Sequence, residues 1–418
     1  MSKFVIQGGK PLKGEIEVHG MKNAATPIIA ATLLTHDECI INNVPQISDV
    51  RKMVEIIKSL GARAEWTDER QLTICCKDAN IGNIDQQKVK SMRSSVLLLG
   101  PLLGRFREVT ISEPGGCIIG KRPLDTHFYA FEKLGAEVQA LNEEYRIKTN
   151  GLKGAEIILP EFSVTATENA IMASVFAGGK TIIKLAAAEP HVQELVDFLN
   201  RMGAKIKWTK THTIEIEGVD KLKGAEHSLI PDQIEIGTWA VAGAATGGEI
   251  SINPVVPEHL DIFMVKMREA NVNAEINGNT LYIRPSSGLK SFKLQSMPYP
   301  GFPTDLQSPF GLLATQCTGT SLIHDPLYEG RMGYINELIK MGANATICDP
   351  HRVLITGPTP LYAREIRSYD LRAGATLVIA GLIAEGETLI NEAEVVDRGY
   401  ESIDERLRAL GASIQRVE

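Results

Sequence analysis

Hydrophobic residues recur at helical spacing in several segments of this chain. In one segment they fall at positions i, i+3, i+4, i+7 and i+10: Val50, Met53, Val54, Ile57 and Leu60. The segment 192–202 repeats this spacing, and in both segments the first residue lies eleven positions before a glycine. Residues at such intervals lie along one helix face, and an apolar face is buried in a folded protein. The pattern predicts amphipathic helices packed against the rest of the fold.

A glycine follows each predicted helix and marks a repeat. Each helix ends in a hydrophobic residue, and then come Gly-Ala and a short strand, as in SLGARAEW (59–66). The marker glycines stand at 61, 135, 203, 342 and 411, and Asn271 takes this place in a sixth, degenerate copy. Glycine and, after it, asparagine best suit the left-handed conformation at a helix end. Successive markers are 74, 68, 68, 71 and 69 residues apart, which predicts six copies of one structural unit.

Between the amphipathic helices lies a second recurring block, a strand followed by an Ala-rich apolar helix. It covers residues 162–184, 232–252, 302–323 and 369–390. Helices that are apolar nearly all round belong in the interior of a fold. Each unit is therefore predicted to be β-α-β-α-β-β, with buried helices inside and sheets around them, so the fold class is α/β. The six units divide naturally as three plus three, with a break near 224–232.

The composition is that of an ordinary soluble globular protein. Of the 418 residues 44% are hydrophobic and 23% charged, and this length usually holds two or more domains. No apolar run reaches the ~18 residues of a membrane span, and the start MSKFVIQGGK lacks the regions of a signal peptide. We therefore expect a cytoplasmic protein with no membrane partner. The net charge of −7 argues against nucleic acid as a partner.

The six cysteines include no CxxC pair, so neither a zinc site nor a disulfide framework is expected. Cys348 and His351 are better interpreted as a turn between strands than as half a metal site. We expect the chemistry in the segment 112–127, SEPGGCIIGKRPLDTH. Two glycines there allow a sharp turn, and Cys117 follows at its tip.

The surroundings of Cys117 favour a reactive thiol. Lys121 and Arg122 follow it closely, and a helix is predicted over 123–134, because proline suits the first turn of a helix. A thiol near two cations and a helix N-terminus ionises more easily than a free one. The alternative is a Gly-rich turn between a strand and a helix, with an incidental cysteine.

The repeats and four short segments resemble the enolpyruvyl transferase superfamily, and look closest to the branch whose acceptor is UDP-N-acetylglucosamine. The segments are PGGCIIGKRPLDTH (114–127), GMKNAATP (20–27), VKSMRSS (89–95) and FPTDLQ (302–307). The resemblance covers the whole chain. It implies a two-domain inside-out α/β barrel with three repeats in each domain. The domain carrying the cysteine loop would be 22–230, and the domain carrying the candidate base 1–21 plus 231–418.

The resemblance also implies the reaction. The enolpyruvyl group of phosphoenolpyruvate would pass to the 3-hydroxyl of UDP-N-acetylglucosamine with release of phosphate, the first committed step of peptidoglycan synthesis. Cys117 would be the proton donor and the target of fosfomycin, and Asp305 the base for the sugar hydroxyl. Lys22 and Arg398, the other catalytic residues, would hold phosphate and carboxylate together with Arg122. No cofactor and no metal ion is implied, and a monomer or weak homo-oligomer is expected.

The substrate-binding residues implied by the resemblance lie in both halves of the chain. Arginine recurs among them because its planar fork fits phosphate and carboxylate, and an acidic chain needs local cations to bind anionic ligands. The set is Lys22, Asn23, Arg93, Arg122, Pro123, Leu124, Asp125, Thr126, Ser163, Val164, Asp305, Leu327, Arg331, Asp370, Arg372 and Arg398.

Several of these residues have ordinary structural interpretations. Lys22 could be a solvated lysine at a helix start, and Asp305 a helix N-cap, a role in which aspartate is common. Arg398 could form a surface ion pair with Asp397. A cysteine hydrolase built on Cys117 and His127 is a weaker alternative.

Three positions depart from the family pattern. Glu161 stands where some relatives carry lysine, Thr165 where SVGAT has glycine, and Gln233 where arginine often occurs. These changes leave open an enolpyruvyl transferase with a different acceptor. A separate hypothesis is a non-catalytic protein that binds a nucleotide sugar.

Overall fold

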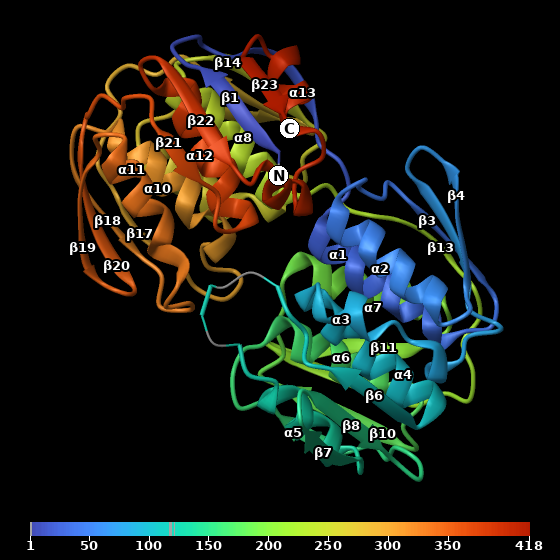
Figure 1. Cartoon of the computed structure of the whole chain (residues 1–418). Coiled ribbons are helices and arrows are strands. Elements are labelled where there is room, and N and C mark those ends of the chain that lie inside the picture. Colours follow the sequence, from blue (N-terminus) through green and yellow to red (C-terminus); the bar gives the residue numbers. More distant parts are fainter. Residues whose placement is uncertain (1, 117–118, 121) are drawn as a thin grey trace. The chain divides into compact units, whose positions relative to one another are not determined.

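The computed structural model describes residues 2–116, 119–120 and 122–418, so Cys117 lies outside the described residues. Its contacts divide the chain into two units (Figure 1). The N-terminal unit holds residues 19–116 and 122–230, and the C-terminal unit holds 2–18, 119–120 and 231–418. The chain therefore changes unit after Val18 and after Ile230, and residues 119–120 belong with the C-terminal unit.

The N-terminal unit contains seven described α-helices and three sheets. The helices are α1 (Lys22–Ala31), α2 (Ser48–Ser59), α3 (Gln86–Lys90), α4 (Leu99–Phe106), α5 (Asp125–Lys133), α6 (Val164–Ser174) and α7 (Pro190–Arg201). One sheet has the order β13 (Glu226–Ser228), β3 (Glu38–Asn42), β5 (Gln71–Cys75) and β4 (Arg63–Asp68). The second is β9 (Glu156–Ile158), β10 (Lys180–Lys184), β12 (Thr213–Glu217) and β11 (Lys205–Lys210). The third is β6 (Glu108–Ser112), β8 (Glu144–Lys148) and β7 (Glu137–Leu141).

The C-terminal unit contains six described α-helices and three sheets. The helices are α8 (Gln233–Ala245), α9 (Asp261–Glu269), α10 (Gln307–Thr315), α11 (Tyr334–Lys340), α12 (Leu371–Ile383) and α13 (Ile403–Ala409). One sheet is β2 (Lys13–Glu17), β14 (Glu249–Asn253), β16 (Thr280–Arg284) and β15 (Asn273–Asn277). The next is β17 (Lys293–Gln295), β18 (Gly319–His324), β20 (Arg352–Gly357) and β19 (Asn344–Asp349). The last is β21 (Glu365–Arg367), β22 (Glu387–Asn391), β1 (Lys3–Gln7) and β23 (Ser413–Val417).

The four-stranded sheets of both units share one pattern of strand directions. In each, the first strand named above runs parallel to the second, and the following neighbours are antiparallel. In the sheet of β1 the positions of β1 and β23 correspond to a hairpin in the other sheets. β1 lies between β22 and β23, with Phe4 opposite Ile390 on one side and Arg416 on the other.

The marker residues confirm the predicted left-handed helix ends. Helices α2, α5, α7, α9, α11 and α13 each end two residues before a marker, and the next strand begins two residues after it. The φ angles of the five marker glycines lie between 87° and 107°, and that of Asn271 is 57°. The Asn271 amide donates to the carbonyls of Ser287 and Gly288 at 2.9 and 3.0 Å. These bonds help an L-residue to adopt the conformation that glycine takes without strain.

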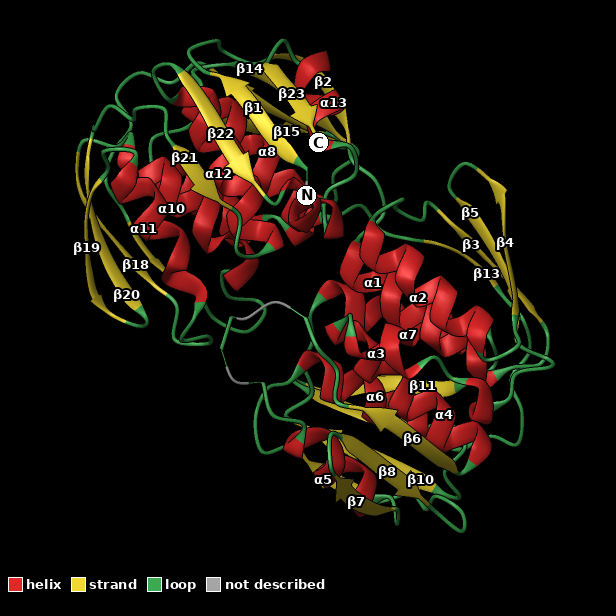
Figure 2. Cartoon of the chain, in the orientation of Figure 1, coloured by secondary structure: helices red, strands yellow, loops and turns green. Residues whose placement is uncertain are grey.

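The apolar helices are buried because their side chains are small and they pack closely. Residues 233–244 of α8 and 371–382 of α12 are all buried. A Cβ at Gly243 would lie 2.8 Å from the side chain of Ile250 on β14, so this glycine allows helix and sheet to approach. Figure 2 shows helices lying between sheets in each unit. This burial confirms the interior position predicted from the sequence.

The predicted helix over 123–134 was wrong at its start. α5 begins at Asp125, because the Leu124 carbonyl is the first to accept helical hydrogen bonds, from His127 and Phe128 at 2.9 and 3.1 Å. Leu124 itself has φ −101° and ψ 5°, outside the helical range, so Pro123 precedes the helix.

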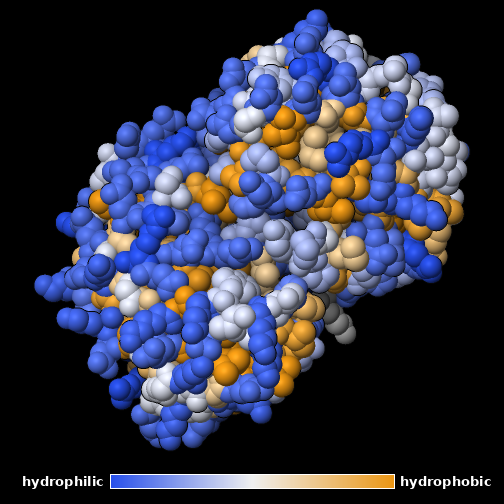
Figure 3. Space-filling view, turned by 180° about the vertical axis from the view of Figure 1, so that it is seen from behind, coloured by the Kyte–Doolittle hydropathy of each residue, from blue (hydrophilic) through white to orange (hydrophobic). Residues whose placement is uncertain are grey.

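No described helix has both the length and the apolar character that crossing a membrane requires. Polar residues cover most of the face seen in Figure 3, with hydrophobic residues in scattered groups between them.

Candidate active site

Asp305 lies in the C-terminal unit, in the 3-10 turn Thr304–Leu306 that leads into α10. The N-cap positions of this turn and of α10 are Pro303 and Leu306, so the helix-cap interpretation of Asp305 is wrong. The carboxylate instead binds two arginines. Oδ1 lies 2.8 Å from Nη2 of Arg331, and Oδ2 accepts from Nε of Arg372 at 3.2 Å.

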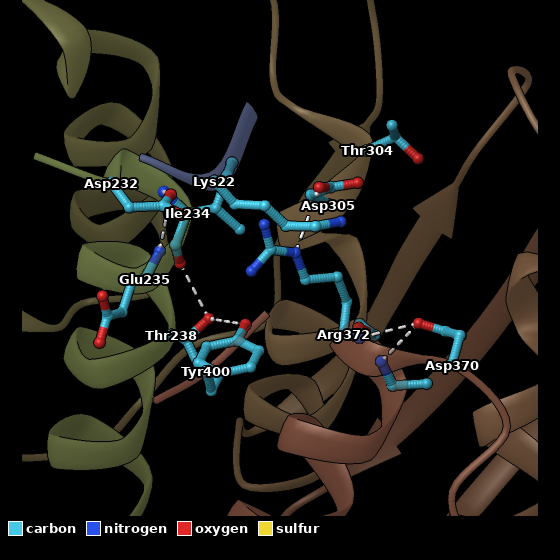
Figure 4. Close-up of polar contacts among 12 residues, drawn as sticks. Lys22, Asp232, Ile234, Glu235, Thr238, Thr304, Asp305, Asp370, Arg372 and Tyr400 are labelled. Atoms are coloured by element: carbon cyan, nitrogen blue, oxygen red, sulfur yellow. Dashed lines mark hydrogen bonds and ion pairs between the residues drawn. The ribbon is translucent and has the colours of Figure 1, made fainter. Parts of the chain in front are cut away.

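Arg372 is placed by the start of α12. Asp370 caps this helix, and its Oδ1 accepts from the backbone N–H groups of Arg372 and Ala373 at 2.8 and 3.0 Å. The side chain of Arg372 is only 3% exposed, and its guanidinium carbon lies 5.2 Å from the ring centroid of Tyr400 (Figure 4). Burial disfavours the charge, but Tyr400 and Asp305 outweigh it, so the pKa of Arg372 lies above its ordinary value.

Both the side chain and the backbone carbonyl of Arg331 form hydrogen bonds. Its Nη1 donates to the Thr304 carbonyl at 3.2 Å, and its own carbonyl accepts from the Gln307 side chain at 3.2 Å. Burial opposes its charge, yet nearby Asp305 and Asp370 raise the pKa of Arg331. A carboxylate with two fixed guanidinium partners has little rotational freedom, so this group is preorganised.

Leu327 lies next to the Asp305 group. Its backbone N–H donates to Oδ1 of Asp325 at 3.0 Å, and Oδ2 of Asp325 accepts from the hydroxyl of Thr304. The Leu327 side chain is 40% exposed, so it is available for contact with a ligand.

Lys22 is the first residue of α1 in the N-terminal unit. Its Nζ lies 3.0 Å from Oδ2 of Asp49, and the two side chains are 11% and 1% exposed. The solvated-lysine interpretation is therefore wrong. Asp49 lies in the first turn of α2, where the helix dipole favours a negative charge. Asn23 follows Lys22 and is half-buried.

The cysteine loop is described only up to its ends, because Cys117, Ile118 and Lys121 lie outside the described residues. Arg93 contacts both ends in the N-terminal unit. Its guanidinium donates to the carbonyl of Arg122 and, at 3.5 Å, to that of Pro114. A Cβ at Gly116 would lie 2.8 Å from Cβ of Arg93, so glycine is needed for this close approach. Arg93 therefore fixes the base of the loop.

The described tip of the loop belongs to the C-terminal unit. The Ile119 carbonyl accepts from the N–H of Gly330 at 3.0 Å. Gly120 has a φ of 134°, and a Cβ there would lie 2.4 Å from Oε2 of Glu329. The φ angle favours glycine at position 120, whereas the contact with Glu329 involves the end of a flexible side chain that can move.

Two of the positions that depart from the family pattern brace the first turn of α5. Oε1 of Glu161 accepts from the Thr126 hydroxyl at 3.0 Å, and the Thr165 hydroxyl lies 3.1 Å from Nε2 of His127. Asp125, the first residue of this turn, is exposed. The turn is therefore held by neutral hydroxyls and one carboxylate.

Asn169 on α6 fixes the tautomer of His127. Its amide oxygen accepts from the N–H of Gly100 at 2.7 Å, so its Nδ2 is the donor to the carbonyl of Val96 at 2.9 Å and to Nδ1 of His127 at 3.0 Å. Nε2 of His127 therefore carries the proton. Burial, together with Arg93, lowers the pKa of His127 to about 3, so the ring is neutral. Both ring nitrogens are engaged, which argues against a hydrolase that uses His127 as base.

Comparison with known proteins decides the family. Residues 6–407 match the family model of EPSP synthase (3-phosphoshikimate 1-carboxyvinyltransferase). The chain belongs to this family. A UDP-N-acetylglucosamine 1-carboxyvinyltransferase of Koribacter versatilis is 43% identical over 420 residues, covering 100% of this chain and 97% of the relative. A second, from Caldanaerobacter subterraneus, is 44% identical over 416 residues, covering 99% of each.

Solved structures of EPSP synthase relatives share the mixed α/β fold. The enolpyruvyl transferase NikO from Streptomyces tendae superposes with a TM-score of 0.91 at 22% identity, covering 100% of this chain and 99% of that one. An EPSP synthase from Acinetobacter baumannii gives a TM-score of 0.76 at 20% identity, covering 100% of both chains. At these identities the likeness concerns the fold.

Other residues discussed for this EPSP synthase family member lie at the first or last positions of helices. Ser163 caps α6 by accepting from the N–H of Ala166 at 3.4 Å, and Val164 is the first helical residue. Gln233 is the first residue of α8. Arg398 ends the 3-10 helix Ala393–Arg398 and is half-buried, and both oxygens of its neighbour Asp397 bind Arg416.

Sequence reasoning missed Asn169, Thr238 and Tyr400. A polar residue inside the apolar α6 was a usable signal for Asn169, because a buried amide needs partners. Tyr400 lies in the segment DRGYE, but nothing local points to its partners. No group of histidine, cysteine, aspartate and glutamate that could hold a metal ion occurs in the part of the chain that the structure describes.

Proposed function

We propose that this chain transfers the enolpyruvyl group of phosphoenolpyruvate to the 3-hydroxyl of UDP-N-acetylglucosamine and releases phosphate, as the first committed step of peptidoglycan synthesis. The observation that carries the proposal is the Asp305 carboxylate held between Arg331 and Arg372. It occurs in a chain 43% identical, over its full length, to a relative named for this activity.

The chemistry divides between an acid and a base. Cys117 gives a proton to the methylene carbon of phosphoenolpyruvate, and the sugar oxygen adds to the neighbouring carbon while Asp305 takes the hydroxyl proton. Loss of a proton from the new methyl group then expels phosphate and restores the double bond. A positioned acid and a positioned base each raise the reaction rate by about 10²–10⁴-fold.

Cations hold the charged groups during these steps. Lys22, Arg122 and Arg398 bind the phosphate and carboxylate of phosphoenolpyruvate, with Asn23 beside Lys22. A charged hydrogen bond in a partly buried site is stronger than one in water. The low exposure of Lys22 supports this role.

Further residues are proposed to bind the nucleotide sugar. Arg93 and residues 123–126 contribute from the loop region, and Ser163 and Val164 from the start of α6. Leu327, Arg331, Asp370 and Arg372 contribute from the C-terminal unit. The contacts of Arg331, Asp370 and Arg372 around Asp305 support a common role.

We also propose that each unit is an inside-out α/β barrel of three β-α-β-α-β-β repeats. The domains would be 22–230 and 1–21 plus 231–418, and the protein a cytoplasmic monomer or weak homo-oligomer. The shared strand order of the four-stranded sheets and the regular spacing of the markers support this division.

The experiment is a phosphate-release assay on the purified protein. Phosphoenolpyruvate plus UDP-N-acetylglucosamine is expected to release phosphate, and omission of either substrate to abolish it. Release with another hydroxyl compound, but none with UDP-N-acetylglucosamine, would overturn the assignment of the acceptor.

A second candidate is an enolpyruvyl transferase with a different acceptor. The hydrogen bonds of Glu161 with Thr126 and of Thr165 with His127 favour this second candidate, because both side chains bind other residues of the protein instead of a ligand. A thermal-shift screen of nucleotides and nucleotide sugars separates the two, since the better ligand raises the melting temperature more.

A further inference from the structure

A group of buried polar side chains lies near Arg372, the partner of Asp305, in the C-terminal unit (Figure 4). Tyr400 and Thr238 are 1% and 2% exposed. The Tyr400 hydroxyl lies 2.8 Å from Oγ1 of Thr238, and Thr238 donates to the carbonyl of Ile234 on α8 at 2.8 Å. Both residues are buried, so the partners of their hydroxyls lie within the protein.

The donors and acceptors in this group can be assigned. The Thr238 hydroxyl has one hydrogen, which goes to the Ile234 carbonyl, so its oxygen accepts from the Tyr400 hydroxyl. The Tyr400 hydroxyl is therefore tied to Thr238, and the ring that carries it lies 5.2 Å from the guanidinium carbon of Arg372. Burial raises the pKa of Tyr400, which keeps the phenol protonated as a donor.

Two contacts orient the Arg372 side chain. Nε donates to Asp305, and the guanidinium lies against the ring of Tyr400. Nη1 has no hydrogen-bond partner among the described residues, although the side chain is 97% buried. A buried donor without a partner is unfavourable, so an acceptor oxygen that reached Nη1 would stabilise it.

We propose that Tyr400, seated by Thr238, is a positioning residue that aims Arg372, and through it Asp305, during enolpyruvyl transfer. The inference rests on the proposed function. Tyr400 acts through Arg372 and does not touch the substrate. Its hydroxyl, tied to Thr238, keeps the ring against the guanidinium while Nε of Arg372 faces Asp305.

The experiment compares Tyr400→Phe, Thr238→Val, the double variant and Thr238→Ser by steady-state kinetics. Tyr400→Phe keeps the ring but loses the hydroxyl. We expect kcat to fall about 10- to 100-fold, as for a lost buried hydrogen bond whose partner stays unsatisfied, with a smaller change in KM. Thr238→Val is expected to cause a similar fall, and Thr238→Ser to restore most of it.

The double variant distinguishes positioning from general damage. If both hydroxyls act through one chain, the double variant is no slower than Tyr400→Phe alone. Tyr282→Phe on β16 is the matched control and is expected to keep kcat, and melting curves show whether each variant is folded.

An unchanged kcat in Tyr400→Phe, or multiplicative losses in the double variant, would overturn the inference. Wild-type protein without activity on UDP-N-acetylglucosamine contradicts the proposed function instead. The same series, run with the acceptor that is used, then tests Tyr400 separately.

Discussion

The two units hold their candidate site residues by different chemistry. In the C-terminal unit the carboxylate of Asp305 binds the guanidinium groups of Arg331 and Arg372. The buried hydroxyls of Thr238 and Tyr400 bind each other nearby. In the N-terminal unit a neutral histidine, an asparagine and hydroxyls brace the start of α5 beside Arg93. Removing one partner of a buried ion pair costs about 3–5 kcal/mol, whereas an unsatisfied neutral group costs about 1–3 kcal/mol.

The difference indicates which unit is built to hold charge in a fixed place. The proposed catalytic base, Asp305, must keep its charge and direction, and its two ion pairs support both. In the proposed function Arg93 and Arg122 bind anions, and a charged ring at His127 would repel the guanidinium of Arg93. The lowered pKa of His127 keeps the ring neutral and avoids this repulsion.

Asp305→Asn gives the largest expected effect. The amide keeps the shape but cannot take the hydroxyl proton, so kcat should fall about 10²–10⁴-fold. Phosphate release measures the loss, and Asp261→Asn, exposed on α9, is the control. Activity within threefold of wild type would show that the charged group is structural.

Asn169→Leu tests the neutral network. It leaves the N–H of Gly100, the carbonyl of Val96 and Nδ1 of His127 without their partner, so the free energy of unfolding should fall by about 2–4 kcal/mol. Urea unfolding measures it, with Asn150→Leu at an exposed position as control. A loss below ~1 kcal/mol would contradict the proposed importance of the amide.

The low pKa of His127 predicts a pH dependence of stability. The folded ring stays neutral down to about pH 3, while the unfolded ring binds a proton below its ordinary pKa of 6.5. The unfolded state therefore holds more protons between these values, and stability falls as the pH falls through this window.

Between pH 7 and pH 5 this group alone should cost about 2 kcal/mol of unfolding free energy. Urea unfolding at both pH values should show this extra loss in the wild type and not in His127→Gln. Equal losses in the two proteins would mean that the ring is charged in the folded state. Glu168 has the opposite effect on the pH dependence of stability, because burial raises its pKa. The variant Glu168→Gln measures how much Glu168 contributes to that dependence.

Glu161→Lys gives the smallest expected effect. It replaces an exposed carboxylate near the loop base by a cation, so KM for UDP-N-acetylglucosamine should fall about 2- to 10-fold, with a weaker effect at high salt. Glu132→Lys, exposed on α5, is the control for net charge. A rise in KM would show that the bond from Thr126 matters more than the charge.

The repeats could be predicted from the sequence because their signal is local. The end of the helix, the glycine or asparagine after it and the start of the next strand all fall within eight residues of sequence. All six marker residues have a positive φ. The start of α5 was missed because proline at 123 fits a helix start and the turn before one equally well.

The partners of buried polar residues could not be predicted in this way. Asp305 has the same sequence surroundings whether it caps a helix or binds arginines 26 and 67 residues away. Tyr400 and Thr238 are 162 residues apart, and only the folded sheets and helices bring them together. Long-range pairing leaves no periodicity in the chain.

The position of β1 affects how the polypeptide matures. β1 lies between β22 and β23, and its Phe4 and Ile6 are fully buried, although β1 is synthesised hundreds of residues before either neighbour. On the ribosome this strand must therefore wait, exposed or held by a chaperone, until its neighbours emerge. A nascent chain interrupted before β22 would keep an unpaired hydrophobic strand at its start, which proteases and chaperones can recognise.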